Sequence, residues 1–371
     1  MAATTPETAR LLAYDCLTPF GDVVATQRAL CEGLSALKLS PVLGKRGGDL
    51  VPLALMAGHG LDEEPQPFWL EGIRGLAARI PGEGWGGPGR PIVVTSSNFG
   101  VGSLYSYLHD GGDPSHLGHG APFSSVEWLR CELGWGEDIT VFSHACVSAH
   151  LGLVHAARLL QHGLADEVLV FSYDFLSPFV AGGFHSLKIL NGQFPAPYRI
   201  QETGSIALGD GAAFVVLTRG RGAFQIEGQA LFNELHHFTS NKADGSGFAS
   251  VLEGLRGAAA GRRLWLKGHG TGTLEAGRLE AESLARAFPG APLVGWKGSL
   301  GHTLGSCGLV ELAIAAESLR RGRAPGTVGT QGPCFSDAVA TESFGLDNFD
   351  AVLCSSNAFG GAHAALLLSH A

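Results

Sequence analysis

Short runs of aliphatic and β-branched residues alternate along this chain with longer segments of helical periodicity. The clearest runs are PIVVTSS at residues 91–97, DEVLVFS at 166–172 and AAFVVLT at 212–218. Their length and composition are typical of buried strands. Residues 151–163, LGLVHAARLLQHG, form a mainly apolar helical pattern that Gly163 would end. The alternation predicts an α/β fold whose sheets are covered by helices.

The order of these segments is repeated. The first half runs through a cysteine motif, a helix, the DEVLVFS strand, a long excursion and GDGAAFVVL. The second half runs through a histidine motif, the helix around GLVELAIAAESLRRG, the strand DAVLCSS and FGGAHAALLL. We therefore expect two pseudo-symmetric halves that share one core, residues 1–220 with the cysteine and residues 221–371 with the histidines. The boundary would fall in the turn near residues 218–226.

The composition excludes several classes of protein. With 371 residues, 45% hydrophobic and 16% charged, the chain can build a large core and is too apolar to be disordered. The formal charge of -9 argues against nucleic acid as a partner, because phosphate binding needs a basic surface. Asp174 and Pro178 interrupt the most apolar window, so we expect no membrane span.

Cysteine and basic residues are dispersed. The seven cysteines form no CxxC pair, which argues against a zinc site or a disulfide framework. The residues after Met1 lack the basic and apolar regions of a signal peptide, so a cytoplasmic protein is the expectation. The short basic clusters are either solvated surface or docking points for an acidic partner, and they are Lys45–Arg46, Arg262–Arg263 and Arg320–Arg321 with Arg323.

Cys146 lies in HACVSAHLGL, residues 144–153, directly before a helix that we predict to begin near Ser148. Taken alone, it is either a core thiol or a nucleophile at a helix N-terminus. Unpaired N–H groups and the helix dipole favour a thiolate at such a position. The choice between the two readings depends on the motifs downstream.

The motif KGHGTGT, residues 267–273, places His269 in a loop rich in glycine and threonine after a strand-like segment. Glycine lets the backbone approach a ligand closely. Thr271 and Thr273 alternate, so both hydroxyl groups are expected to face one channel.

Two further motifs lie near the C-terminus. KGSLGHTLGSCGLVE, residues 297–311, supplies Lys297, His302 and Glu311 ahead of and within a helix that would start near Ser306. SSNAFGGAHAALLL, residues 355–368, is a glycine-containing turn followed by a strand. Such a turn can offer backbone N–H groups to a developing oxyanion.

The four motifs, in this order, resemble those of the β-ketoacyl-ACP synthases of the thiolase superfamily, in the elongating branch with a Cys-His-His set. The resemblance covers nearly the whole chain and implies the thiolase-like fold, a duplicated α/β/α/β/α arrangement of five layers. It also implies decarboxylative Claisen condensation of an acyl group with malonyl-ACP. Substrates would be carried on the phosphopantetheine of an acyl carrier protein, with no metal and no separate cofactor.

The resemblance assigns a role to each candidate residue. Cys146 would carry the acyl group as a thioester, and His269 and His302 would hold the malonyl thioester and stabilise its enolate. The remaining roles are the oxyanion hole, from the backbone N–H groups of Cys146 and Phe359; gating of the acyl pocket, by Phe359; support of the site, by Lys297 with Glu311; and binding of the pantetheine arm, by Thr271 and Thr273.

Some segments depart from the family's pattern. The family's PFDxxRDGF reads YRIQETGSI here, and its gating turn FGFGG reads NAFGG, with Asn357 for an aromatic residue and Ala358 for a glycine. We expect Ala358 to stiffen or bend the turn, because a Cβ disfavours positive φ. Glu280 keeps a family acid and is interpreted as structural, and Cys307 is not expected to act as a second catalytic cysteine. The departures predict a specialised polyketide or aryl-polyene type of synthase.

Two alternatives remain open. One is a non-catalytic partner subunit that shapes the pocket of a ketosynthase heterodimer, as a chain-length factor does, although such partners usually lack the nucleophile. The other is an acyltransferase on the same fold that uses Cys146 without decarboxylation. The family implies a dimer, either a homodimer or a heterodimer with a sister subunit. Arg320, Arg321 and Arg323 are the candidates for docking the carrier protein.

Overall fold

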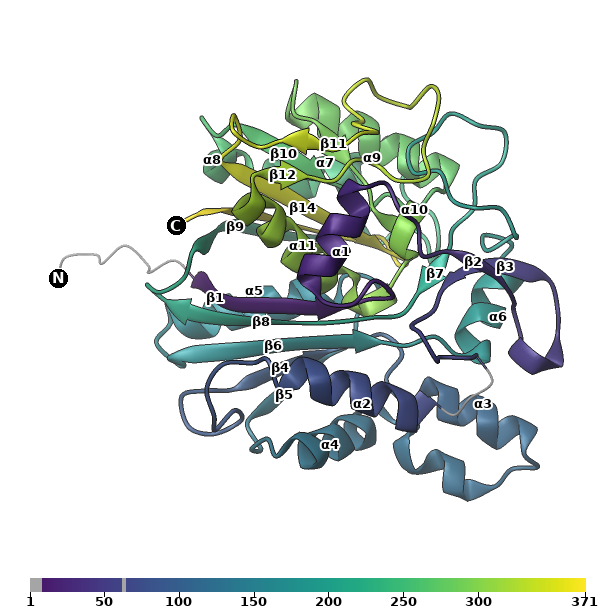
Figure 1. Cartoon of the computed structure of the whole chain (residues 1–371). Helices are drawn as coiled ribbons and strands as arrows, with labels where there is room; N and C mark the ends of the chain where they lie inside the picture. The colour runs from purple at the N-terminus through teal and green to yellow at the C-terminus, as the bar shows by residue number, and fades with distance from the viewer. Residues whose placement is uncertain (1–8, 62–64) are drawn as a thin grey trace.

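The computed structural model describes residues 9–61 and 65–371, and its central feature is a 10-stranded sheet with the order β11-β10-β14-β15-β9-β1-β8-β6-β4-β5 (Figure 1). The N-terminal set of strands is β1 (Ala9–Leu17), β4 (Ile92–Thr95), β5 (Ile139–Phe142), β6 (Glu167–Asp174) and β8 (Gly211–Arg219). The C-terminal set is β9 (Phe224–Asn233), β10 (Leu264–Lys267), β11 (Leu293–Val294), β14 (Ala351–Ala358) and β15 (Ala362–His370).

The two sets have the same topology. In each set, the second strand along the chain is parallel to the third and the fourth, whereas the fifth is antiparallel to the fourth and the first. The sets meet where β1 and β9 pair antiparallel, at Arg10↔Gln225 and Leu11↔Phe224. The predicted pseudo-symmetry of the fold is therefore confirmed. The numerical division after residue 220 lies in the turn between β8 and β9 and stays a prediction.

The side chains of the strands alternate between two cores. In β6, Val168 and Val170 face the middle of the molecule, whereas Leu169 and Phe171 face outward into a second core. Successive residues of a strand point to opposite faces, so a strand that is apolar throughout needs a cover on both sides. This requirement explains why the predicted runs read as continuous apolar segments.

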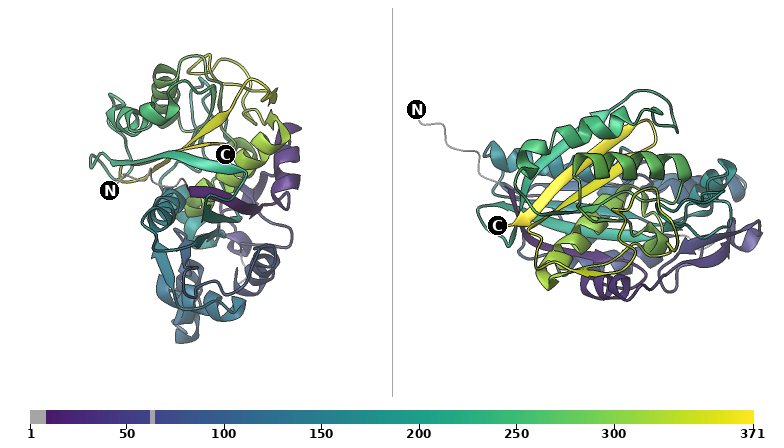
Figure 2. Two further views of the ribbon diagram at one scale, coloured as in Figure 1. Left: turned by 90° about the vertical axis from the view of Figure 1, so that its left-hand side faces the viewer. Right: turned by 90° about the horizontal axis from the view of Figure 1, so that it is seen from above.

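Helices provide those covers and produce the five layers (Figures 1 and 2). The middle layer contains α5 (Ser148–Gln161) and α11 (Cys307–Arg321), with α1 (Val23–Cys31) packed on α11. The outer layers are α2 (Pro65–Ala77) and α4 (Pro122–Leu133) on the N-terminal set, and α7 (Ser246–Glu253), α8 (Arg256–Ala259) and α9 (Leu274–Ala287) on the C-terminal set.

Smaller elements complete the described part of the chain. A second sheet has the order β2-β3-β7, and β12 pairs with β13. The bounds are β2 (Lys38–Pro41), β3 (Leu50–Ala54), β7 (Leu208–Gly209), β12 (Arg323–Ala324), β13 (Phe344–Gly345), α3 (Val101–His109), α6 (Pro178–Ser186), α10 (Lys297–Leu300) and the 3-10 turns η1 (Gly44–Arg46), η2 (Pro114–His119) and η3 (Leu304–Ser306).

The predicted elements agree with the structure. The three apolar runs are β4, β6 and β8, and the predicted helix is α5, which Gly163 follows with a φ of 67°. Among the described residues, no helix is long and apolar enough to cross a membrane. The prediction that the chain lacks a signal peptide concerns its first residues, of which residues 1–8 lie outside the described part.

Candidate active site

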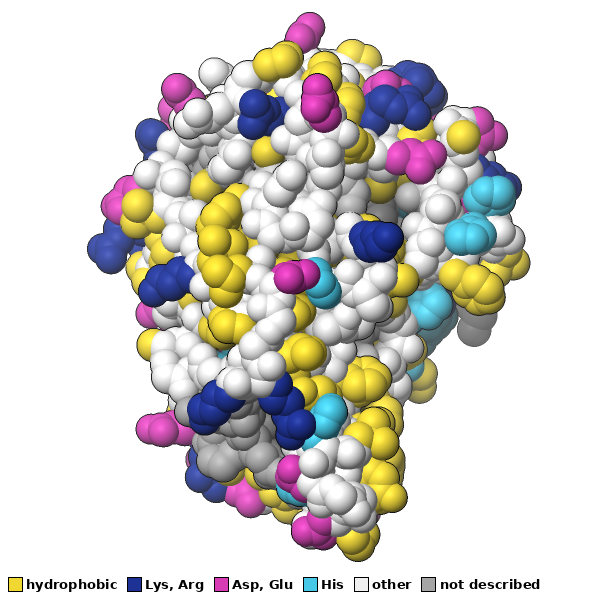
Figure 3. Space-filling model, turned by 90° about the vertical axis from the view of Figure 1, so that its right-hand side faces the viewer, with side chains coloured by type: hydrophobic (Ala, Val, Ile, Leu, Met, Phe, Trp, Pro, Cys, Tyr) yellow, Lys and Arg dark blue, Asp and Glu magenta, His cyan; other side chains and the backbone are white. Residues whose placement is uncertain are grey.

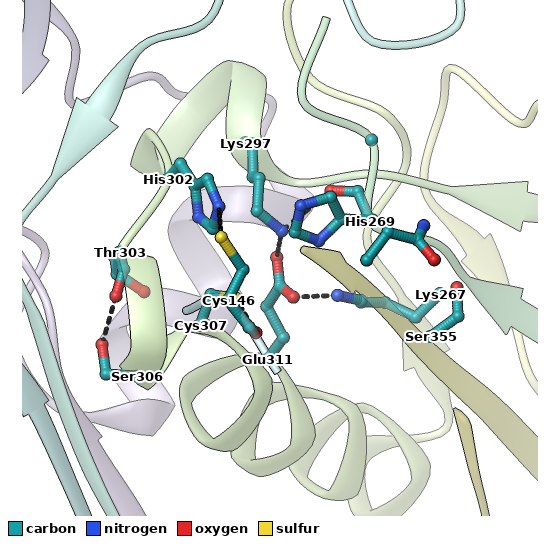
Figure 4. Close-up of polar contacts among 12 residues, drawn as sticks. Cys146, Lys267, His269, Lys297, His302, Thr303, Ser306, Cys307, Glu311 and Ser355 are labelled. Carbon is teal, nitrogen blue, oxygen red and sulfur yellow. Dashed lines mark hydrogen bonds and ion pairs between the residues drawn. The ribbon is translucent and has the colours of Figure 1, made fainter. Parts of the chain in front are cut away.

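The candidate site forms where the carboxyl ends of three parallel strands meet the starts of the two middle helices. The loop after β10 carries His269, α10 after β11 begins at Lys297, and β14 ends beside the turn that contains Phe359. Ligand sites in α/β sheets commonly lie outside the carboxyl ends of strands. Cys146 precedes α5, and His302 precedes α11, so both middle helices begin at this site. The side chains of Cys146 and His302 point toward each other (Figure 4).

Cys146 stands on a strained turn. Ala145 has a φ of 46°, a region that L residues rarely adopt. The hydroxyl of Ser148 holds the turn, since it accepts the His144 backbone N–H at 2.7 Å and donates to the Ala145 carbonyl at 2.7 Å. The helix begins at Ser148, as predicted. The turn leaves Cys146 9% exposed, with its sulfur toward His302.

The two side chains Cys146 and His302 are in direct contact. His302 Nε2 lies 2.9 Å from Cys146 Sγ, and the Leu304 backbone N–H donates to His302 Nδ1 at 3.2 Å. A neutral imidazole has one N–H, so an N–H donor on Nδ1 places the ring proton on Nε2. Leu304 adopts a φ of 53° where it makes this contact. The ring is thereby set to donate a hydrogen bond into the site.

Burial keeps the Cys146 thiol and the imidazoles of His269 and His302 uncharged. It raises the pKa of the Cys146 thiol, an effect to which Cys307 adds and which Lys297 opposes. Burial, reinforced by Lys297, also lowers the pKa values of His269 and His302 well below the ordinary value. Both imidazoles are therefore neutral at physiological pH. The position of Cys146 at a helix start is therefore not sufficient to make it a thiolate in the free protein.

The loop that carries His269 is held by Glu280, which lies on α9. One carboxylate oxygen accepts the His269 backbone N–H at 2.6 Å, and the other accepts the Gly270 N–H at 2.9 Å. Tyr198 and Ser355 donate hydroxyl groups to the same carboxylate at 3.0 Å and 3.1 Å. Glu280 therefore stabilises the loop that contains His269 through its backbone, as a structural acid would.

Behind the histidines lies a buried cluster of ion pairs. Lys297 Nζ contacts Glu311 Oε1 at 2.7 Å and the His269 carbonyl at 2.8 Å (Figure 4). Burial alone would lower the pKa of Lys297, but Glu311 raises it; burial would raise the pKa of Glu311, but Lys267 and Lys297 lower it. The predicted pairing of Lys297 with Glu311 is present.

Lys267 was not predicted as a site residue, although its ammonium group contacts the second oxygen of Glu311. The alternation of side chains along β10 could have predicted that Lys267 faces the middle layer. Leu264 and Leu266 face the outer core and Trp265 faces the middle core, so Lys267 must also face the middle layer. The identity of its partner depends on how α11 packs, which is not a local property of the sequence.

A cavity of about 320 Å³ opens over Cys146, His269 and His302. Thr271 and Thr273 both line it, and their hydroxyl oxygens are 3.1 Å apart, so they share one channel as expected. The apolar part of the wall comes from Phe184, Leu187, Ile189, Ile206, Ala358 and Phe359. The rings of Phe184 and Phe359 stack with centroids 5.9 Å apart.

The altered gating turn differs from expectation. Ala358 is the last residue of β14 and is paired with Ala362, whereas the positive φ values fall on Gly360 at 86° and Gly361 at 75°. The reason given for expecting a stiffer or differently bent turn is therefore wrong, because Ala358 is not at a positive φ. Asn357 donates to Glu280 at 3.0 Å, and its oxygen lies 2.8 Å from His363 Nδ1.

The other sulfur and basic candidates lie outside the cavity lining. Cys307 is buried and its Sγ donates to the Cys146 carbonyl at 3.4 Å, and burial raises its pKa to about 11. Arg320 and Arg321 pair with Glu317 at 2.6 Å in the last turns of α11, the helix end opposite Cys307. On the face shown in Figure 3, Lys and Arg side chains are dispersed in small groups.

Cys146, His269 and His302 also form a possible set of metal ligands, because their donor atoms all lie within 4.8 Å of one another. A metal ion on His302 Nε2 would require the proton to move to Nδ1, which faces the Leu304 N–H. Two buried ammonium groups nearby would also repel a cation. The arrangement therefore fits a hydrogen-bonding site better than a metal centre.

Comparison with known sequences supports the resemblance. Residues 225–331 match the family described as beta-ketoacyl synthase, C-terminal domain. The 3-oxoacyl-[acyl-carrier-protein] synthase 2 of Vibrio cholerae is 28% identical over 260 residues, which are 62% of each chain. The tetracenomycin polyketide synthase ketoacyl synthase alpha subunit of Streptomyces glaucescens is 29% identical over 67% of this chain and 64% of its own. The chain thus spans less than two thirds of these curated relatives.

Solved structures share the fold over the whole chain. A type II polyketide ketosynthase in complex with its acyl-carrier protein covers 99% of this chain with a TM-score of 0.85 and 16% identity, and 100% of that chain is matched. A ketosynthase in complex with its chain length factor from Xenorhabdus doucetiae has a TM-score of 0.79 at 20% identity, with coverages of 99% and 100%. These similarities confirm the predicted thiolase-like fold class.

Proposed function

We propose that this chain, which belongs to the β-ketoacyl synthase family, catalyses decarboxylative Claisen condensation between an acyl thioester on Cys146 and a malonyl thioester on a carrier protein. The observation that carries the proposal is the contact of 2.9 Å between Cys146 Sγ and a His302 nitrogen whose proton points into the site. Such a pair offers a nucleophile and a hydrogen-bond donor to one bound thioester.

In the first half-reaction, Cys146 Sγ attacks the carbonyl carbon of the acyl-carrier thioester. The tetrahedral oxyanion would receive hydrogen bonds from the backbone N–H groups of Cys146 and Phe359. Collapse breaks the bond to the carrier sulfur, and the carrier thiol leaves with the proton that Cys146 gives up. The products are acyl-Cys146 and free carrier thiol.

In the second half-reaction, His269 and His302 would donate to the thioester carbonyl of a malonyl group. Loss of carbon dioxide leaves the electron pair of the broken carbon–carbon bond in an enolate, whose oxygen the two N–H groups stabilise. The enolate carbon attacks acyl-Cys146, and the cysteine sulfur leaves. The product is a β-ketoacyl carrier two carbons longer. Neutral histidines suit this role, and burial keeps both of them neutral by lowering their pKa values.

The supporting residues would act on binding and alignment. Thr271 and Thr273 line the channel and would hydrogen-bond the phosphopantetheine arm, which is part of the carrier rather than a separate cofactor. Lys297 would fix the His269 carbonyl through its contact of 2.8 Å. Phe359, stacked on Phe184, would gate the acyl pocket. The setting is a cytoplasmic enzyme that works with a discrete carrier and pairs with itself or with a sister subunit.

The substrate is proposed to be an unsaturated or aryl chain of polyketide type. The stacked pair Phe184 and Phe359 at the cavity wall supports this choice, since flat aromatic faces favour planar conjugated groups. Equal use of long saturated acyl carriers would contradict it. A non-catalytic partner role is less favoured, because the nucleophile and both histidines converge on one cavity.

The test is the intact mass of the protein after incubation with a panel of acyl carriers. We expect a mass gain equal to the acyl group in the wild type and in Cys307→Ala, which removes a neighbouring buried thiol, but not in Cys146→Ala. Subsequent addition of malonyl carrier should discharge the adduct and give a β-ketoacyl carrier. Absence of any adduct would favour the partner-subunit role, and an adduct that malonyl carrier never discharges would favour a simple acyltransferase.

A further inference from the structure

The buried ion cluster contains one lysine more than the pairing of Glu311 requires. Lys297 already satisfies one oxygen of Glu311 at 2.7 Å, and its side chain is 1% exposed. Lys267, also 1% exposed, contacts the other oxygen. Removing a second ammonium group from water is strongly unfavourable in general, so a single ion pair beside an apolar residue would have the lower desolvation free energy. The second lysine therefore needs a reason beyond neutralising Glu311.

A second buried carboxylate supplies that reason. Glu280 is 2% exposed, and its hydrogen bonds go to uncharged donors: two backbone N–H groups, two hydroxyl groups and the Asn357 amide. Glu280 acts on Lys297, whose pKa it helps to raise. Lys297 therefore faces two carboxylates, and Lys267 supplies the second cation of these four charged groups. With Lys267 the four groups sum to zero, and without it they sum to minus one.

The sign of this sum matters for an anionic substrate. A malonyl group brings a carboxylate into the site, and the electron pair it leaves behind becomes an enolate. A neutral acyl thioester brings no charge. A buried site with excess negative charge would repel the first substrate and tolerate the second, because interactions between charges are poorly screened away from water.

We propose that Lys267 is a positioning residue of the condensing site, which holds Glu311 between two ammonium groups and sets the buried formal charge so that an anionic acyl donor is accepted. The proposal rests on the condensing function proposed above. Lys267 ends β10 two residues before His269, so its backbone also fixes the start of the histidine loop. The pairing of Lys267 with Cys354 in β14 and Val294 in β11 locks its register.

Other titratable groups share this environment and will respond to the same charge. Asp174 is a further buried carboxyl group that acts on Cys146, and it does not enter this sum because burial raises its pKa to about 7 and favours its neutral form. The groups that interact with Lys267 or its partners are His150 of α5, Glu311 and Cys307 of α11, Cys354 of β14, Lys297 of α10, Glu280 of α9, and His269 and His302 of the active-site loops.

The first test compares two substrates in Lys267→Met, which removes the charge and keeps an unbranched side chain of nearly the same length. We expect the KM for malonyl carrier to rise about tenfold, while the KM for a neutral acyl carrier stays within about twofold of the wild type. A merely structural lesion would impair both substrates alike. Lys38→Met, which removes an exposed lysine on β2, should change neither constant.

The second test restores the formal charge. In Lys267→Met/Glu311→Gln the sum returns to zero, because a cation and an anion are both lost, and the amide introduced at position 311 would still accept a hydrogen bond from Lys297. The readout is the rate of alkylation by iodoacetamide at a fixed pH of about 8, taken from the mass of the Cys146 adduct, because well below the raised pKa of this thiol the rate follows the thiolate fraction. We expect the rate to fall about tenfold in Lys267→Met and to return toward the wild type in the double variant.

Two outcomes would overturn the proposal: a wild-type alkylation rate in Lys267→Met, or a double variant that is no closer to the wild type than the single one. If Lys267→Met fails to fold, Lys267→Gln provides the same charge change with a polar side chain, and Lys267→Arg should behave as the wild type. Alkylation needs no carrier, so this test remains informative even if the condensing function fails in the acyl-carrier assay.

Discussion

The replacement Glu280→Ala tests whether one carboxylate holds the histidine loop in place. The side chain is 2% exposed and accepts from the backbone N–H groups of His269 and Gly270 at 2.6 Å and 2.9 Å. It also accepts from Tyr198, Ser355 and Asn357 at 3.0, 3.1 and 3.0 Å. All five donors would lose their acceptor in one change.

The magnitude follows from the two backbone donors. A buried N–H group left without a partner costs about 1–3 kcal/mol, and the hydroxyl and amide donors can turn toward other acceptors more easily than the backbone. Loss of the network is therefore expected to lower the free energy of unfolding by about 3–5 kcal/mol, which is within the range for broken buried networks. At about 2 °C per kcal/mol for a chain of this size, the midpoint of thermal unfolding should fall by roughly 6–10 °C.

The assay is thermal unfolding of the wild type, Glu280→Ala and Glu282→Ala. Glu282 lies on the same helix and pairs with Arg278 at 3.0 Å on a partly exposed surface, so its loss should change the free energy of unfolding by about 0.5 kcal/mol or less. Malonyl decarboxylation should also fall in Glu280→Ala, because the His269 loop loses its anchor. Equal unfolding midpoints for the two variants would refute the reasoning.

Three further predictions concern a glycine of the histidine loop, the ion pairs at the end of α11 and the buried titratable groups. Gly268→Ala would place a Cβ 2.1 Å from the Tyr198 hydroxyl oxygen, so we expect thermal unfolding at a clearly lower temperature, whereas Gly257→Ala, with open space in α8, should be neutral or slightly stabilising. Arg320→Gln with Arg321→Gln should lower the unfolding temperature by removing both ion pairs of the buried Glu317. Slower acylation of Cys146 by carriers would instead identify these arginines as docking residues. Burial holds the pKa values of His269 and His302 well below the ordinary value and lowers that of His150 to about 4. Below a pH of about 6.5 the unfolded chain therefore binds more protons than the folded chain, and the free energy of unfolding should fall as the pH drops. The Asp174 carboxyl, whose pKa burial raises to about 7, has the opposite sign and gains stability as the pH falls from 7 toward 4, so Asp174→Asn should show a steeper loss between pH 7 and 5 in urea unfolding.

Local sequence patterns were sufficient to predict the main strands and the ends of the middle helices. Apolar runs bounded by turn residues identified β4, β6 and β8, and a glycine with positive φ ended α5 where expected. The motifs placed Cys146, His269 and His302 in one site through the family resemblance. Their distances depend on the packing of elements that are far apart in the sequence, and a periodic pattern does not contain that information.

The positions that sequence reasoning missed or misjudged are those whose partners are distant. Lys267 meets Glu311, 44 residues later, and Asn357 meets Glu280, 77 residues earlier. Ala358 was misjudged for a different reason. The register of the β14–β15 hairpin decides which residue has a positive φ. Because Ala358 pairs with Ala362, the positive φ values fall on Gly360 and Gly361. A motif alone does not fix the register of a hairpin.

The repeated topology explains why Cys146 and His302 meet. The helix between the third and fourth strands of each half is α5 in one case and α11 in the other, and both lie in the middle layer. Cys146 and His302 each stand shortly before the start of that helix. Cys146 directly follows Ala145, and His302 accepts the backbone N–H of Leu304; Ala145 and Leu304 both have a positive φ. The Cys307 sulfur at the start of α11 reaches the Cys146 carbonyl at the start of α5, at 3.4 Å. Two helix N-termini therefore converge on one point, and both favour a negative charge there, as a thiolate or an enolate would bring.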